Sequence, residues 1–344
     1  MNIKTYVKGM GSALGSKVIT NESLENKLGE KARKAIKSTG IKRRFEAGEN
    51  ENFYTLAADS ATMAMKNAGV KKEDISGFFV SSNPSTPLLM PSPDSVIADM
   101  MGFERLERSG NYMGCAGGVV ALQAATDRLS NSDVEKNYLI ISGDTTRNML
   151  KEGSMDNILF SDATTAMVVS NNSENAIYGV EDVQNVLLPK GYMALNVPNE
   201  YAGSETVKLN HEGRSVFKFA TGVVPVELEK MVGEKALSGE YFIIPHQSNE
   251  RILKKSFRKA GEDNVYTRGI VNVGNTSQDS ALRGLIDTYE NNLNKDKDIL
   301  LAVYGEGLNI ATAKLKPLNK VPFDASLTQG ELFDTSMWKQ VYEK

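Results

Sequence analysis

The stretch NYMGCAGGVVALQAATDRL, residues 111–129, is the most informative part of the sequence. It predicts an apolar helix with a lone cysteine at its start. Cys115 is the only cysteine in 344 residues, and small residues (Gly114, Ala116 and Gly117) surround it. A cysteine at a helix N-terminus feels the positive end of the helix dipole, which predicts a lowered thiol pKa and a nucleophilic thiolate. A lone cysteine can equally be a small buried hydrophobic residue. The stretch alone leaves both interpretations open.

The composition of the chain excludes several classes of protein. Hydrophobic residues make up 40% and charged residues 24%, values typical of a globular protein with a sizeable core. The net charge of −3 gives no sign of nucleic-acid or membrane binding, and no apolar run is long enough to span a bilayer. One cysteine cannot form an internal disulfide, and the N-terminus lacks the apolar segment of a secretory signal. We therefore expect a cytoplasmic protein with no metal site, no nucleic acid and no membrane partner.

Short apolar strands alternate with amphipathic helices along the chain, which predicts an α/β architecture. The expected elements include strands at 3–10, 75–81, 138–144, 241–245, 269–274 and 299–305, and helices at 24–36 (capped by Ser23), 53–68 and 215–231. A turn-rich break at 171–175 separates two halves with similar strand and helix order. We expect an N-terminal half at 1–170 with the cysteine, a C-terminal half at 171–317 with a histidine and an asparagine, and an extension at 318–344.

Three chemical groups are expected at the ends of strands in the second half. His246 follows the strand YFIIP, Asn275 follows the expected strand GIVNVG, and the turn Gly305–Gly307 follows LLAVY. Ligands bind at such strand ends in open α/β sheets. A thiolate, an imidazole, an amide and backbone N–H donors together suit acyl transfer.

Each of these groups also has a purely structural interpretation. A single histidine after a strand is more often structural than catalytic, and His211, in a polar string, reads as a surface or loop residue. Asn275 can shape a turn and cap the next helix, and the glycine turn can be a plain hairpin. Their joint occurrence on a chain with one cysteine favours the functional interpretation.

Several motifs in one order carry a resemblance to a known family. They are TGIKRR (39–44), GCAGG (114–118), LFSDATTAMVV (159–169), GRSVFK (213–218), PHQSNERI (245–252), GNTSQDS (274–280) and YGEGLNIA (304–311). From the N-terminus to about residue 317 the chain resembles the β-ketoacyl-acyl-carrier-protein synthase III group of the thiolase superfamily. The resemblance implies a duplicated, five-layered αβαβα fold and a homodimer.

The resemblance also implies a mechanism and its residues. Cys115, His246 and Asn275 would form the catalytic triad, and Cys115 would accept an acyl group from a coenzyme A or acyl-carrier-protein thioester. The oxyanion would be held by the Cys115 N–H and by a backbone N–H of the turn from Gly305 to Gly307. A malonyl-type thioester would then lose carbon dioxide and condense with the acyl group. No permanently bound cofactor is implied.

The chain departs from the family at two places. Ser161–Ala166 (SDATTA) replaces a glycine-rich GDGAGA string. In family members that stack the adenine of coenzyme A between a Trp and an Arg, those places correspond here to Lys34 and about Ser154. Neither side chain can stack an adenine, which favours an acyl carrier protein over coenzyme A as the carrier of the donated acyl group. The family segment before Pro91 places Met90 in the acyl pocket.

A basic stripe follows His246. Its members recur at helical spacing and are Arg251, Lys254, Lys255, Arg258 and Lys259. A solvated helix face explains such a stripe, but an acidic acyl carrier protein would also be attracted to it. In the family a similar helix, with a Lys at the place of Lys218, serves this docking.

Three other functions compete with condensation. A papain-like peptidase also orders Cys, His and Asn, but its cysteine lies near the mature N-terminus in a CGSCW-like string, which this chain lacks. An acyltransferase of the same fold could pass the acyl group to an alcohol or amine. A catalytically silent partner subunit is the third alternative, and the joint presence of Cys115, His246 and Asn275 argues against it.

Overall fold

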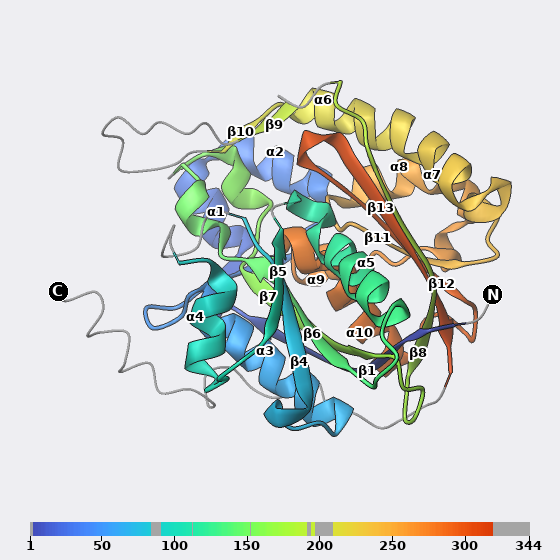
Figure 1. The fold of residues 1–344 in the computed structure, drawn as a ribbon. Helices are drawn as coiled ribbons and strands as arrows, with labels where there is room; N and C mark the ends of the chain where they lie inside the picture. The colour runs from blue at the N-terminus through green and yellow to red at the C-terminus, as the bar shows by residue number, and fades with distance from the viewer. Residues whose placement is uncertain are drawn as a thin grey trace.

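A computed structural model describes residues 3–83, 91–111, 113–151, 153–190, 194–196 and 209–318. Within these residues, nine strands form one large sheet in the order β11-β12-β13-β8-β1-β7-β6-β4-β5 (Figure 1). The expected α/β architecture is confirmed. Met90 and residues 319–344 of the predicted extension lie outside the described residues.

The elements before residue 171 form one side of the sheet and the helices near it. The strands are β1 (Thr5–Leu14), β4 (Ile75–Ser81), β5 (Glu107–Asn111), β6 (Asn137–Asp144) and β7 (Ala163–Ser170), and the helices are α3 (Phe53–Ala68), α4 (Pro93–Met100) and α5 (Gly117–Ser130). A small hairpin with two helices completes this side: β2 (Lys17–Thr20), α1 (Asn21–Leu28), α2 (Glu30–Thr39) and β3 (Arg43–Glu46).

The elements after residue 171 form the other side. The strands of the large sheet are β8 (Tyr178–Leu187), β11 (Phe242–Pro245), β12 (Ile299–Gly305) and β13 (Asn309–Pro317), and β9 (Leu195–Asn196) pairs with β10 (Asn210–His211). The helices are α6 (Gly213–Lys218), α7 (Val224–Val232), α8 (Glu250–Ser256), α9 (Arg268–Asn272) and α10 (Ser280–Asn291). A π-helical turn, Phe219–Val223, joins α6 to α7, so the helix expected at 215–231 is interrupted.

The strand pairing repeats on the two sides. β1 pairs antiparallel with β7, β7 antiparallel with β6, and β6 parallel with β4. In the same way β8 pairs antiparallel with β13, β13 antiparallel with β12, and β12 parallel with β11. The sheet is continuous across the expected boundary, because β1 pairs with β8 through Thr5–Val180, Tyr6–Gly179 and Val7–Tyr178. The boundary at residue 171 stays a prediction.

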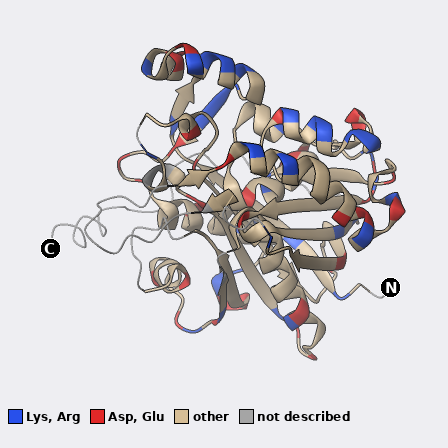
Figure 2. Ribbon diagram, turned by 90° about the horizontal axis from the view of Figure 1, so that it is seen from above, with Lys and Arg blue, Asp and Glu red and all other residues tan. Residues whose placement is uncertain are grey.

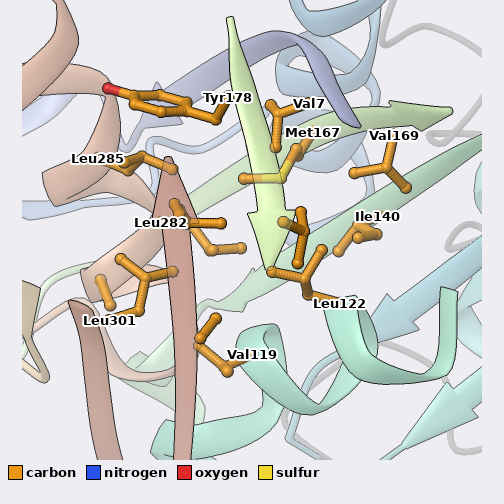
Figure 3. Packing of buried hydrophobic residues seen from close by; sticks show 14 of the residues in the cluster. Val7, Val119, Leu122, Ile140, Met167, Val169, Tyr178, Leu282, Leu285 and Leu301 are labelled. Atoms are coloured by element: carbon orange, nitrogen blue, oxygen red, sulfur yellow. The ribbon is translucent and has the colours of Figure 1, made fainter. Parts of the chain in front are cut away.

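Helices α5 and α10 lie between the two parts of the sheet and form the middle layer (Figure 1). Figure 3 shows their side chains, among them Val119, Leu122 and Leu282, converging with residues of the strands in the largest buried cluster. A second buried cluster lies under α3 and α4, and a third lies under α7 and α8. The layers therefore run helix, sheet, helix, sheet, helix, as predicted.

Two expected elements differ in the structure. The helix expected at 24–36 is two helices, since Gly29 has a left-handed φ of 77° and ends α1. Its cap is Thr20 rather than Ser23, because the Thr20 side chain accepts the backbone N–H of Ser23. The strand expected at 269–274 is wrong, since this segment forms α9 and its continuation. Val273 and Gly274 donate to the carbonyls of Gly269 and Ile270, which is the helical pattern.

Candidate active site

Cys115 lies in a short 3-10 turn, Gly114–Ala116, directly before α5. Its residue is 7% exposed, and its Sγ lies 3.9 Å from the Oγ of Ser277. Gly114 has a left-handed φ of 48°, and a Cβ there would overlap the carboxylate of Glu306. The sequence thus placed the cysteine correctly at the entrance to a helix, and only glycine fits before it.

The expected lowering of the Cys115 pKa is wrong for the protein without substrate. Burial raises the pKa of the thiol, and the carboxylates of Glu306 and Asp144 raise it further. The hydrogen bond from Ser277 acts in the opposite direction but is smaller. Because desolvation disfavours a thiolate, the resting thiol is protonated. Burial of this depth cannot be read from the local sequence.

Asp144, at the end of β6, is fully buried near the cysteine and was not identified in the sequence. Its carboxylate accepts the backbone N–H of Asn83 at 2.6 Å and the side-chain amide of Gln278 at 3.1 Å. Ser277 also bonds to Asp144, while burial raises the pKa of this carboxyl to about 7. Asp144 thus links the end of β6 to the loop that holds Ser277 beside the sulfur.

His246 follows β11, as expected, and is buried at 3% exposure. Its Nδ1 lies 2.9 Å from the Oγ of Ser280 at the start of α10, and its ring packs edge-on against Tyr304. Burial lowers the pKa of His246 to about 3, so the ring is neutral at physiological pH. Nε2 is the ring nitrogen left for a ligand.

Asn275 is held by the strand-like segment before β7. The Asn275 N–H donates to Leu159 at 2.9 Å, and its carbonyl accepts the N–H of Ser161 at 2.8 Å. Its side-chain oxygen accepts the N–H of Ser277, which has a left-handed φ of 61°. Asn275 therefore follows a helix rather than a strand, and its side chain supports the strained residue beside the sulfur.

The string SDATTA (161–166), where glycines were expected, is hydrogen-bonded to the segments around the site. The Ser161 hydroxyl donates to the carbonyl of Val273, and Asp162 accepts the N–H of Thr146 at 2.7 Å. The hydroxyl of Thr165 donates to Asp279 at 2.9 Å. Hydroxyl and carboxyl hydrogen bonds thus fix the segment without the glycines.

One cavity brings the three candidate catalytic residues together. Cys115, His246 and Asn275 all line a space of about 790 Å³ with Gly305. An adjoining space of about 700 Å³ also reaches Cys115, and its apolar wall consists of Met149, Leu150, Phe160, Leu195 and Leu209. The structure thus gathers residues that are 131 and 160 positions from Cys115 in the sequence.

The glycine turn lies directly against the cysteine. A Cβ built on Gly305 would lie 2.7 Å from the backbone nitrogen of Cys115, and Gly307 has a left-handed φ of 72°. Between them, Glu306 directs its carboxylate at Cys115 and accepts its backbone N–H. The turn therefore meets Cys115 where the sequence predicted, but the predicted oxyanion donor of Cys115 is already bonded to Glu306. The sequence analysis did not identify Glu306. Its position as a charged residue between two glycines, directly after a buried strand, was the feature that could have indicated it.

The predicted basic stripe is divided between two elements. α8 ends at Ser256, so Arg258 and Lys259 lie in the following 3-10 turn, Arg258–Ala260, and not on one continuous helix. All five stripe residues and Lys218 are exposed. Lys254 pairs with Glu250 at 2.9 Å and Lys259 with Glu229 at 2.7 Å.

Two of the remaining cations, Arg251 and Lys255, lie near the cavity. The Arg251 guanidinium and the Lys255 ammonium lie 5.3 Å and 5.0 Å from the ring centre of Phe217, which lines the cavity of Cys115. Figure 2 shows both signs of charge spread over the molecule.

His211, expected in a loop, is a half-buried residue of the cavity wall. Its Nδ1 lies 3.0 Å from the carboxylate of Asp156. Lys34, at the place of an adenine-stacking residue, is exposed on α2 and pairs with Glu30 at 3.2 Å. Ser154 precedes a 3-10 turn and accepts hydrogen bonds from Asn157.

Within the described residues, no helix is long and apolar enough to cross a membrane. The described residues also contain no group of three or more His, Cys, Asp or Glu that could hold a metal ion.

Comparison with known proteins gives one consistent family. Residues 112–184 match the family described as 3-oxoacyl-[acyl-carrier-protein (ACP)] synthase III. A β-ketoacyl-[acyl-carrier-protein] synthase III of Campylobacter jejuni is 29% identical over 324 residues, which cover 91% of this chain and 98% of that protein.

Solved structures share the fold. The 3-oxoacyl-(acyl carrier protein) synthase III of Pseudomonas aeruginosa PAO1 has a TM-score of 0.82 at 21% identity, covering 93% of this chain and all of that one. The priming β-ketosynthase of the R1128 polyketide pathway has a TM-score of 0.81 at 23% identity, covering 91% of this chain and 96% of that one. These similarities establish the thiolase-like fold that the motifs predicted.

Proposed function

We propose that this chain, a β-ketoacyl-acyl-carrier-protein synthase III-like protein of the thiolase superfamily, condenses an acyl thioester with a malonyl-type thioester. The observation that carries the proposal is the single cavity lined by Cys115, His246 and Asn275. A sulfur nucleophile, a neutral imidazole and an amide on one cavity are the groups that acyl transfer and enolate stabilisation need. On this basis the chain is a condensing transferase.

In the first half-reaction, Cys115 loses its proton and Sγ attacks the carbonyl carbon of an acyl thioester. The oxyanion accepts the Cys115 N–H and a backbone N–H of the Gly305–Gly307 turn, and loss of one such donor typically costs about 3 kcal/mol of barrier. The carrier thiolate leaves and takes up a proton. The product is an acyl group on Cys115.

In the second half-reaction, the malonyl-type thioester loses carbon dioxide and its thioester becomes an enolate. His246 offers a neutral ring nitrogen and Asn275 an amide to the enolate oxygen. The enolate carbon attacks the acyl carbonyl, a carbon–carbon bond forms, and Sγ leaves. The products are a β-ketoacyl thioester and free Cys115, and the scheme needs no permanently bound cofactor.

The acyl chain would occupy the apolar space beside Cys115. Five apolar side chains form most of its wall (Met149, Leu150, Phe160, Leu195 and Leu209), which suits a hydrocarbon chain, and Glu306 is the charged residue that lines it. Met90, predicted to line this pocket, stays a prediction because it lies outside the described residues.

An acyl carrier protein is the proposed donor or acceptor of the thioesters. Lys218, Arg251, Lys255 and Arg258 are exposed, and none of them forms an ion pair within the described residues. Arg251 and Lys255 contact Phe217, which lines the cavity, so a carrier bound here would present its arm toward Cys115. Lys254 and Lys259 contribute less, because Glu250 and Glu229 neutralise them. A homodimer and a cytoplasmic location complete the proposal.

The test is intact-protein mass spectrometry after incubation with acyl-coenzyme A and acyl-carrier-protein thioesters of several chain lengths. We expect one acyl adduct on the native protein and none on Cys115→Ala, because no other sulfur nucleophile exists in the chain. The same adduct on Cys115→Ala would contradict the proposal.

Carbon dioxide distinguishes the two reactions that begin with the same adduct. Release from a malonyl thioester together with loss of the adduct indicates condensation. Loss of the adduct to an alcohol or amine without carbon dioxide would instead indicate the acyltransferase.

A further inference from the structure

Glu306 occupies a position that the proposed chemistry requires to be free. It lies between Gly305 and Gly307, in the 3-10 turn that follows β12. Its carboxylate accepts the backbone N–H of Cys115 and packs against Gly114, where a Cβ would overlap it. It also lines the apolar space that reaches the sulfur. The side chain is therefore inserted beside the nucleophile.

The contacts of this carboxylate conflict with binding of a thioester oxygen. The oxyanion in the first half-reaction needs the Cys115 N–H, and the Glu306 carboxylate holds that donor in the free protein. Burial raises the pKa of the Glu306 carboxyl, and its ionised form disfavours a thiolate on Cys115. One side chain thus opposes both formation of the nucleophile and binding of its substrate.

We propose that Glu306 is a gate on the acylation step, whose carboxylate fills the oxyanion position and keeps Cys115 unreactive until an acyl thioester displaces it. This inference rests on the proposed function, since the gate acts on the first half-reaction. The displaced carboxylate loses its backbone hydrogen bonds. The thioester oxygen then accepts the hydrogen bond from the backbone N–H of Cys115. Removal of the negative charge then makes ionisation of the thiol easier.

In this proposal the side chain of Glu306 moves and the turn stays. A Cβ on Gly305 would lie 2.7 Å from the Cys115 nitrogen, and Leu308 after the turn is buried with a left-handed φ of 55°. Within the described residues, no Lys or Arg forms an ion pair with Glu306 that would hold it. The gate therefore requires rotation of one side chain that no ion pair restrains.

Four titratable groups face the sulfur or its immediate neighbours, and all enter the pH dependence of its reactivity. They are Glu306 after β12, Asp144 at the end of β6, His246 after β11 and Tyr304 on β12. Burial keeps His246 neutral, and burial raises the pKa of Tyr304, so neither carries charge at neutral pH. Glu306 and Asp144 oppose the thiolate when they are ionised, and burial raises the pKa of both carboxyls, that of Asp144 to about 7.

The test measures alkylation of Cys115 by iodoacetamide, a small uncharged probe, between pH 6 and 9. We compare the native protein with Glu306→Gln, which removes the charge, and Glu306→Ala, which removes the side chain. Glu73→Gln, an exposed residue of another 3-10 turn, is the matched control. Thermal unfolding of each variant verifies that it is folded.

We expect both Glu306 variants to be alkylated at least tenfold faster than the native protein at pH 7.5, with a lower pH midpoint, and Glu73→Gln to match the native protein. A single-turnover reaction with acyl-coenzyme A should also be no slower in Glu306→Ala. Equal or slower alkylation of the folded Ala variant would overturn the gate. Faster alkylation with slower acylation would also overturn it, because Glu306 would then assist the reaction.

The outcomes separate the gate from the function on which it rests. If the native protein and every variant fail to form an acyl adduct, the proposed function is wrong. The alkylation comparison still decides whether Glu306 restrains the thiol.

Discussion

At the residue scale, the hydrogen bond between His246 and Ser280 determines which proton the imidazole can offer. The Ser280 Oγ lies 2.9 Å from Nδ1 and also accepts the N–H of Gln247. If the serine hydroxyl donates to Nδ1, then Nε2 carries the proton and can donate to an enolate oxygen. Ser280 therefore positions His246 without contacting the substrate.

His246 should be insensitive to pH across the physiological range. Because burial lowers its pKa to about 3, the ring stays neutral above that pH and gains a proton only below it. We expect carbon dioxide release from a malonyl thioester by the double variant Cys115→Ala and Asp144→Asn to be constant between pH 5 and 8. The first substitution removes the ionisation of the thiol from the profile, and the second removes the Asp144 carboxyl, whose pKa burial raises to about 7.

A rate that rises through an apparent pKa near 6.5 would show instead that His246 titrates as an ordinary histidine. Ser280→Ala provides the second readout. It should lower carbon dioxide release by about tenfold with an unchanged KM, as expected for a positioning residue.

The sequence predicted three residues that line one cavity, but it did not predict the electrostatics of that cavity. Cys115, His246 and Asn275 could be proposed because each lies in a motif of the sequence, although the strand expected before Asn275 is a helix. The direction of the thiol pKa could not, since it depends on burial and on two carboxylates far away in the chain. Long-range contacts of this kind leave no local pattern.

At the element scale, α8 and the turn after it present the cations proposed to meet the carrier protein. The double reversal Arg251→Glu and Arg258→Glu should raise the KM for acyl carrier protein several-fold at low salt. Repulsion of an acidic partner acts mainly through the association rate, and salt screens it. Steady-state kinetics at low and high ionic strength measure the effect.

A matched reversal on a remote helix separates local docking from net charge. The double reversal Lys66→Glu and Lys71→Glu, at exposed positions on α3 and just after it, changes the net charge by the same amount and should leave the KM unchanged. The same KM for the double variant and the native protein at low salt would rule out docking at this surface.

Elements with strong local signals were predictable, and elements defined by tertiary contacts were not. α3 spans the residues expected, because Asn52 caps its start and Gly69 ends it in the left-handed conformation. The apolar run at 269–274 suggested a strand, yet Gln247 binds the N–H of Ile270 and the segment turns into a helix. A side chain 23 positions earlier decides its conformation.

At the scale of the whole molecule, the layer of α5 and α10 between the two parts of the sheet packs into the largest buried cluster of the described residues. Leu282 on α10 is 1% exposed and packs in the largest buried cluster (Figure 3). Leu282→Ala should lower the free energy of unfolding by about 2–5 kcal/mol, because it removes buried methyl groups and leaves a cavity. Urea denaturation measures the change.

The same substitution at an exposed leucine provides the control. Leu187 on β8 is 63% exposed, so Leu187→Ala should change the free energy of unfolding by less than about 0.5 kcal/mol. Equal losses for the two variants would mean that α10 is not part of the stabilising core.

The pairing of β1 with β8 has a consequence for the alignment of the site. Only three residue pairs join β1 to β8. Cys115 lies among the elements before residue 171, whereas His246 and Asn275 lie among the elements after it. A slip of one residue in this short register would shift one group of elements along the other by about 3.3 Å. That displacement exceeds the length of a hydrogen bond, so three residue pairs at the centre of the sheet help set the alignment of the nucleophile with its partners.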